Sequence, residues 1–158
     1  MTTLLDETMF RAVSDNFSGS IIITDPRQGI LYVNPATLHM SGYSTDELLG
    51  RTPAIFKSGQ TPEWIYRELW QTLAAGRIWK GEFINRRKDG MHYLESKTIA
   101  AIRDTQGEVL YYFAIGENMS LHQDYQQRIE TLLAFDPLTG LPNRKEFLHR
   151  LAQAQENA

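Results

Sequence analysis

Cysteine is missing from this 158-residue chain, and so are long basic or apolar stretches. Without cysteine the chain has no disulfide framework, no thiolate metal site, no covalent haem attachment and no cysteine nucleophile. The formal net charge is only −3, and no run of Lys and Arg is long enough to neutralise a row of phosphates. These absences make nucleic acid and anionic membranes unexpected partners.

No window reaches the roughly 20 apolar residues that a membrane-spanning helix requires. The N-terminal sequence MTTLLDE also lacks the basic region and the long apolar region of a secretion leader. The sequence therefore predicts a cytoplasmic protein without a membrane segment.

Residues suited to metal binding or acid–base catalysis are scattered along the chain. The histidines fall on different predicted elements, without metal-ligand spacing, at His39, His92, His122 and His149. The carboxylates that we interpret as helix caps or solvated side chains, and not as catalytic pairs, are Asp46, Glu47, Glu63 and Glu95. We therefore expect no metal site and no enzymatic activity in this chain.

Five stretches have the composition and the flanking turns of β-strands. They are residues 19–24, 30–34, 80–87, 91–102 and 108–117. Turn sequences separate the neighbours in each hairpin: DPRQG, KDG and DTQG. With 42% hydrophobic and 22% charged residues, the chain has enough apolar surface for one core, so we expect one globular domain with an appendage.

Helix signals fill the gap between the second and third predicted strands. Pro35 suits the first turn of one short helix, and Ser44 with Glu47 forms a capping box for the next. A longer helix is predicted to begin with Thr61 as its N-cap and to end at Gly76. Its predicted buried stripe consists of Ile65, Leu69 and Leu73.

Two further helices are predicted outside this core. One covers residues 6–14, where Met9, Phe10 and Val13 form an apolar stripe that we expect to pack against another apolar surface. The other covers residues 121–132 and carries a narrow apolar stripe on a polar background. We interpret the second as a signalling linker that pairs with its copy in a homodimer; packing against its own domain is the simple alternative.

The order of these elements and several motifs resemble the PAS domain family. The motifs are ITD at 23–25, ILYVNPA at 30–36, SGYS at 41–44, ELLGR at 47–51 and NRRKDG at 85–90. The resemblance implies an α+β fold, with a five-stranded antiparallel sheet, helices on one face around a cofactor cavity, and flanking helices at both ends. It divides the chain into a flanking helix at 1–14, a PAS domain at 15–120, a helical linker at 121–135 and a further segment at 136–158.

Within that family the chain resembles the FAD-binding, redox-sensing PAS domain of the nitrogen-fixation regulator NifL. The shared stretches are SGQTP at 58–62, LW at 69–70, WKG at 79–81, NRRKD at 85–89 and YY at 111–112. The resemblance implies FAD as cofactor, with FMN less expected. Ile22 and Pro53 depart from polar residues at two flavin-site positions of that sensor, so signalling details do not transfer.

Two other cofactor chemistries of the family are disfavoured. Haem-binding relatives take an axial histidine from the long cavity helix, and residues 61–75 contain none. Light-sensing relatives form a flavin adduct through cysteine, which this chain lacks.

The segment at 136–144, DPLTGLPNR, resembles the entry of GGDEF domains, which make cyclic di-GMP from two GTP molecules. The Gly-Gly-Asp-Glu-Phe signature that holds metal and substrate is absent from the chain. The resemblance implies that residues 136–158 are the truncated start of a GGDEF domain. It also implies a diguanylate cyclase as the output domain of the parent protein and no cyclase activity in this chain.

A flavin cavity requires flat apolar walls and a few polar groups directed at the ring. Strand alternation places Phe83 and Asn85 on one face, and the side-chain amide of Asn85 offers a donor and an acceptor. Trp70 follows Leu69 on the helix that faces the cavity. The plainer alternatives are an Asn85 that satisfies a neighbouring strand or a water, and a Trp70 that is only a core side chain.

Four more residues complete the predicted cofactor site: Ile22, Asn34, Lys57 and Ser58. Lys57 and Ser58 belong to a loop that can supply amides and one positive charge, although an ordinary solvent loop has the same composition.

The sequence thus predicts a sensor of redox state or oxygen, in which a changed hydrogen bond at the flavin biases the sheet and then the linker helix. Two alternatives stay open. One is a ligand-free PAS module for dimerisation and signal relay, and the other is a PAS domain that binds another small molecule.

Overall fold

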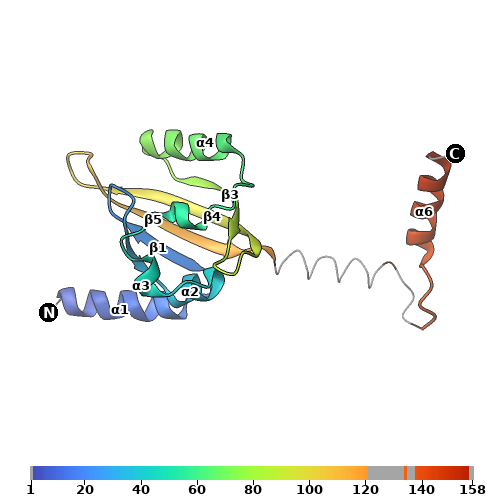
Figure 1. The fold of residues 1–158 in the computed structure, drawn as a ribbon, viewed down its shortest axis with the longest axis horizontal. Helices are drawn as coiled ribbons and strands as arrows, with labels where there is room; N and C mark the ends of the chain where they lie inside the picture. The colour runs from blue at the N-terminus through green and yellow to red at the C-terminus, as the bar shows by residue number, and fades with distance from the viewer. Residues whose placement is uncertain (1, 121–133, 135–137, 157–158) are drawn as a thin grey trace. The chain divides into compact units, whose positions relative to one another are not determined.

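The computed structural model describes residues 2–120, 134 and 138–156. The chain divides into two units, Met1–Met119 and Ser120–Ala158. Each unit is described by itself, and the first contains the whole sheet (Figure 1).

Five antiparallel strands form one sheet in the first unit. They are β1 (Ser20–Thr24), β2 (Ile30–Val33), β3 (Trp79–Arg86), β4 (His92–Arg103) and β5 (Val109–Asn118). Their spatial order is β2-β1-β5-β4-β3, so β1 and β5 lie side by side in the centre although they are far apart in sequence. The predicted α+β class, the strand number and the antiparallel pairing are confirmed.

Polar turn residues close the hairpins as their chemistry predicts. Asp25 Oδ1 accepts hydrogen bonds from the amides of Arg27 at 2.8 Å and Gly29 at 2.9 Å. Gly90 and Gly107 have φ angles of 91° and 86°, which a residue with a side chain rarely adopts. The DPRQG, KDG and DTQG sequences therefore fix where each strand of the hairpins ends.

Four helical segments connect β2 to β3: α2 (Pro35–Ser41), α3 (Thr45–Leu48), the 3₁₀ turn η1 (Pro53–Phe56) and α4 (Glu63–Ala74). The capping box on α3 is confirmed, because Ser44 accepts from the Glu47 amide and Glu47 accepts from the Ser44 amide. Figure 1 shows α4 beside β3, while α2 contacts β1 and α3 contacts β2.

The predicted N-cap of α4 is wrong. Thr61 does not cap the helix, since Pro62 occupies the N-cap position without a side-chain hydrogen bond. Instead, the Thr61 hydroxyl accepts from the Ile84 amide at 2.9 Å and donates to the Ile84 carbonyl at 3.2 Å. This hydroxyl therefore connects the start of α4 to β3. It satisfies the amide and carbonyl of Ile84 on the outer side of β3, which is an edge strand of the sheet.

Asn34 connects three elements from a fully buried position. Its Oδ1 caps α2 by accepting from the Thr37 amide at 3.1 Å, and accepts from the Ile21 amide at 2.8 Å. Its Nδ2 donates to the carbonyls of Ser14 at 3.1 Å and Gly19 at 2.9 Å. One amide thus joins the end of helix α1 (Thr2–Asn16), strand β1 and helix α2.

Helix α1 is held at its C-terminal end. The Phe10 and Tyr32 rings meet edge to face with 5.4 Å between centroids, and the Ser14 and Tyr32 hydroxyls lie 2.6 Å apart. Met9 and Val13, however, are 69% and 63% exposed. The predicted apolar stripe is therefore covered within this unit only in part, at Phe10, which keeps 38% of its surface exposed.

The buried apolar side chains form two separate clusters instead of one continuous core. The first comprises Ile22, Ile30, Val33, Leu48 and Phe56. The second comprises Leu69, Leu73, Trp79 and Phe83 and lies between α4 and β3. This division leaves space between the clusters on the inner face of the sheet.

In the second unit, helix α6 covers Arg144–Glu156. Asn143 Oδ1 accepts from the Glu146 amide at 2.9 Å, as an N-cap does. The predicted linker helix at 121–132 lies outside the described residues. Within residues 2–120, 134 and 138–156, no helix is long and apolar enough to cross a membrane.

Substituting Asn34→Ala should lower the free energy of unfolding by at least about 2 kcal/mol, because buried amide and carbonyl groups on three elements lose their partner. Ser44→Ala is the matched control: it removes an N-cap from the exposed start of α3 and should cost about 1 kcal/mol or less. Urea denaturation of both variants measures the difference. Equal losses would contradict the joining role of Asn34.

Candidate functional site

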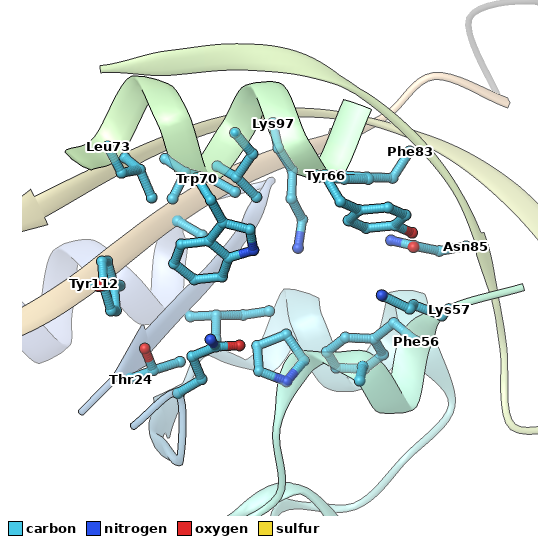
Figure 2. A pocket seen from close by; sticks show the side chains of 17 residues that line it. Thr24, Phe56, Lys57, Tyr66, Trp70, Leu73, Phe83, Asn85, Lys97 and Tyr112 are labelled. Carbon is cyan, nitrogen blue, oxygen red and sulfur yellow. The ribbon is translucent and has the colours of Figure 1, made fainter. Parts of the chain in front are cut away.

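A cavity of about 160 Å³ lies between the two apolar clusters and takes its walls from both. Strands β1, β3, β4 and β5 form one wall, and η1 and α4 form the opposite one. The side chains that Figure 2 labels around it are Thr24, Phe56, Lys57, Tyr66, Trp70, Leu73, Phe83, Asn85, Lys97 and Tyr112. The fold thus places aromatic, aliphatic and polar groups around one pocket.

Strand β3 supplies one wall by simple alternation. Phe83 and Asn85 are 6% and 5% exposed and both line the cavity, whereas Ile84 between them faces outward. The prediction that Phe83 and Asn85 share an inward face is confirmed. Ile22 on β1, at 3% exposure, lines the cavity as well.

Aromatic rings border the cavity from both the helix and the sheet. Tyr66 on α4 stacks on Phe83 with 5.4 Å between centroids and an interplanar angle of 26°. Trp70, on the same helix, meets Tyr112 of β5 edge to face at 5.5 Å. These rings give the cavity flat apolar walls, and 38% of the Trp70 surface remains exposed.

The structure separates the loop residues that were assigned together. Lys57 lines the cavity, with its Nζ 4.0 Å from the centre of the Tyr66 ring. Ser58 does not line it: its hydroxyl donates to the Ile84 carbonyl and accepts from the Gln60 amide at 3.1 Å. The Ser58 side chain therefore holds the loop against β3.

Asn34 also lies away from the cavity lining. The hydrogen bonds that join α1, β1 and α2 already engage both ends of its amide. Asn34 is therefore not placed to contact a ligand in this cavity, because its polar atoms are used within the fold.

A buried carboxylate that the sequence analysis interpreted as solvated lies beside the cavity. Glu95 on β4 is 2% exposed. Its Oε1 accepts from the Ser20 hydroxyl at 2.6 Å, and its Oε2 accepts from Asn85 Nδ2 at 2.8 Å. The solvated interpretation of Glu95 is wrong, since the register pairs Phe83 with Glu95 and turns both inward.

Lys97 is the counter-charge of this carboxylate. It lies two residues after Glu95 on the same strand, is 6% exposed, and its Nζ is 3.5 Å from Glu95 Oε2. Lys97 lines the cavity and directs its ammonium inward (Figure 2). The Glu-x-Lys spacing on a strand next to an inward-facing Asn85 was the signal that could have identified this pair.

Gly116 on β5 leaves the room that the carboxylate needs. A Cβ atom at this position would lie 2.3 Å from Glu95 Oε1 and 2.7 Å from the Ser20 hydroxyl. Both distances are far below van der Waals contact, so any side chain at 116 would displace the Ser20–Glu95 hydrogen bond.

Tyr93 is the next inward residue of β4 and pairs with Asn85 across the hairpin. Burial raises the pKa of the Tyr93 phenol, and the nearby Glu95 carboxylate acts in the same direction. The phenol is therefore neutral at physiological pH. The described part of the chain contains no group of three or more metal-ligating side chains.

Thr24 carries a polar atom that the fold does not satisfy. The residue is 5% exposed, and its Oγ1 has no hydrogen-bond partner among the described residues. Thr24 lines the cavity together with Trp70 and Tyr112. A buried hydroxyl without a partner costs about 1–3 kcal/mol, unless a bound molecule supplies the missing hydrogen bond.

Thr24→Val should raise the free energy of unfolding of the ligand-free protein by about 1 kcal/mol, because a methyl group replaces the unsatisfied hydroxyl at equal volume. The matched control is Thr61→Val, which removes a hydroxyl with two backbone partners and should lower the same quantity by about 1–3 kcal/mol. Chemical denaturation of ligand-free samples measures both. A destabilised Thr24→Val variant would mean that Thr24 has an internal partner.

Comparison with known proteins agrees with this architecture. A family model described as PAS domain matches residues 18–120. A nitrogen fixation regulatory protein of Klebsiella oxytoca is 38% identical over 121 residues, which are 77% of this chain and 24% of that protein. The chain thus spans about a quarter of the length of this relative.

Solved structures share the fold at lower sequence identity. An RNA-binding light-oxygen-voltage receptor superposes with a TM-score of 0.70 at 24% identity, covering 85% of this chain and 39% of that one. A light-oxygen-voltage domain studied with a flavin analogue superposes with a TM-score of 0.64 at 23% identity, covering 81% and 98%.

Proposed function

The chain belongs to the PAS domain family, and we propose that it is a redox-sensing or oxygen-sensing module that binds FAD in the cavity between α4 and the sheet. The observation that carries the proposal is the cavity itself, which combines flat aromatic walls with polar side chains that the fold leaves available. Its similarity to the nitrogen fixation regulatory protein supports the assignment.

The residues around the cavity suit a large planar ligand with a polar edge. Trp70, Tyr66 and Phe83 provide apolar faces and edges. The Asn85 amide lines the cavity, donates to Glu95 through Nδ2 and hydrogen-bonds the Tyr93 phenol; we propose that its oxygen also accepts from a ring N–H. The unpartnered hydroxyl of Thr24 offers one more hydrogen bond, and Lys57 lies where a phosphate-bearing arm would find a positive charge.

A bound flavin supplies redox chemistry that this chain's own side chains lack. The protein's part is to hold the ring, exclude water and respond to its hydrogen bonding. A change at the Asn85 amide reaches Glu95 Oε2 directly, and Glu95 Oε1 passes it to Ser20 on β1. Because Gly116 on β5 contacts the same carboxylate oxygen, we propose that this chain of contacts biases the end of β5.

The two alternatives make different demands on these residues. A ligand-free relay module would need neither Asn85 in the cavity lining nor an unpartnered Thr24 hydroxyl. A different small molecule could use the same cavity, so the identity of the chromophore decides between FAD, FMN and another ligand.

We propose that the output of the parent protein is a diguanylate cyclase, since DPLTGLPNR at 136–144 resembles the entry of that domain. We also propose that the chain acts as a homodimer through its flanking helices. The exposure of Met9 at 69% and Val13 at 63% on α1 supports this, because a partner helix would cover both.

This chain should form no cyclic di-GMP from GTP and Mg²⁺, because the Gly-Gly-Asp-Glu-Phe signature is absent from it. Chromatography of the reaction products after incubation measures the yield, with a known diguanylate cyclase as positive control. Product formation by this chain would overturn the assignment of catalysis to a separate output domain.

The purified protein should be yellow and release FAD on heat denaturation. Trp70→Ala should weaken flavin binding about tenfold, and so lower occupancy, since an aromatic contact contributes up to about 1.5 kcal/mol and about 1.4 kcal/mol is tenfold in affinity. Trp64→Ala is the matched control on the same helix: Trp64 is 57% exposed and does not line the cavity, so occupancy should stay close to wild type. The ratio of the visible flavin absorbance to the ultraviolet protein absorbance measures occupancy.

A colourless wild-type protein that cannot be reconstituted with FAD or FMN would favour the relay module. Equal occupancy in the Trp70 and Trp64 variants would place the ligand elsewhere.

A further inference from the structure

The Lys97 ammonium is incompletely satisfied by its protein partners. Its oxygen partner is Glu95 Oε2 at 3.5 Å, which is long for a charged hydrogen bond, and the Phe56 ring centre lies 5.8 Å away. The same oxygen accepts a shorter bond of 2.8 Å from Asn85 Nδ2. Figure 2 shows the ammonium directed into the cavity, where it has room for another acceptor.

The two members of the pair differ in how much they depend on each other. Glu95 keeps hydrogen bonds from Ser20 and Asn85 if the ammonium moves away. Lys97, in contrast, has three N–H donors and is only 6% exposed, so these donors need acceptors within the protein or on a ligand. A ligand atom with negative charge is the acceptor that best satisfies such a cation.

We propose that Lys97 determines the charge preference of the cavity, by shifting its ammonium from Glu95 toward a ligand that acquires a negative charge. The inference rests on the proposed function. Two electrons and one proton added to an oxidised flavin leave one net negative charge on the ring system. The electrons come from an external donor, dithionite in the experiment below, and the proton comes from solvent, while Lys97 keeps its three protons and forms no covalent bond.

The competing explanation is that Lys97 only balances Glu95. In that case the pair would contribute to folding and leave the relative affinity for oxidised and reduced ligand unchanged. Removing both charges together separates the two explanations, because a neutral pair leaves no buried charge without a partner.

The test is the midpoint potential of the flavin-loaded protein in a dithionite titration. Lys97→Met with Glu95→Gln should weaken the preference for the reduced over the oxidised form at least about tenfold, which for a two-electron couple is about 30 mV in the midpoint potential. Lys97→Arg, which keeps a cation, should stay close to wild type. Lys80→Met is the matched control, since Lys80 is an exposed residue of β3 on the outward face.

The affinity for oxidised flavin, measured by reconstitution of the ligand-free protein, should fall less in the double variant than the affinity for reduced flavin, because the oxidised ring is neutral. Circular dichroism establishes that each variant is folded, and Lys97→Gln with Glu95→Gln, which is also a neutral pair, replaces the first double variant if that protein does not fold. An unchanged midpoint potential in the neutral variant, or an equal loss of oxidised and reduced binding, would overturn the role of Lys97. A wild-type protein that takes up no flavin would instead overturn the proposed function and this inference with it.

Discussion

The burial of one carboxylate governs much of this structure. Glu95, at 2% exposure, has to receive hydrogen bonds and a counter-charge, because an unpaired carboxylate in this position would cost several kcal/mol. Its partners come from β1 through Ser20, from β3 through Asn85 and from β4 through Lys97. On β5 the same carboxylate requires the absence of a side chain at Gly116.

This requirement explains why the core has two clusters. Apolar side chains cannot close over Asn85, Glu95 and Lys97 without removing the few partners that these groups have. The apolar contacts therefore gather on either side, around Leu48 and Phe56 on one and around Leu73 and Trp79 on the other. The cavity lies between the two clusters, and Asn85 and Lys97 form its polar side.

Much of the fold was predictable from local signals in the sequence. The hairpin turns, the capping box of Ser44 and the inward alternation of Phe83 and Asn85 each depend on residues close together in the chain. The sequence analysis assigns Asn34 to the cofactor site, but its position directly before Pro35 is also typical of an N-cap, which is the role that it has in the structure. The network around Glu95 was missed because it depends on strand register, which pairs residues from β1, β3 and β4 across long stretches of sequence.

The same register determines what a ligand in the cavity can influence. Gly116 pairs with Ser20 on one side and with Lys97 on the other, so a single row across the sheet joins β1, β5 and β4. Ser20 and Lys97 in that row both bind Glu95, and Glu95 also binds Asn85. A shift of the carboxylate toward or away from Lys97 must therefore change its distance to Ser20 or its contact with Gly116. Because β5 ends at Asn118, two residues after Gly116, this row of residues lies next to the point where the chain leaves the sheet, which is why we propose that a change inside the cavity is transmitted there.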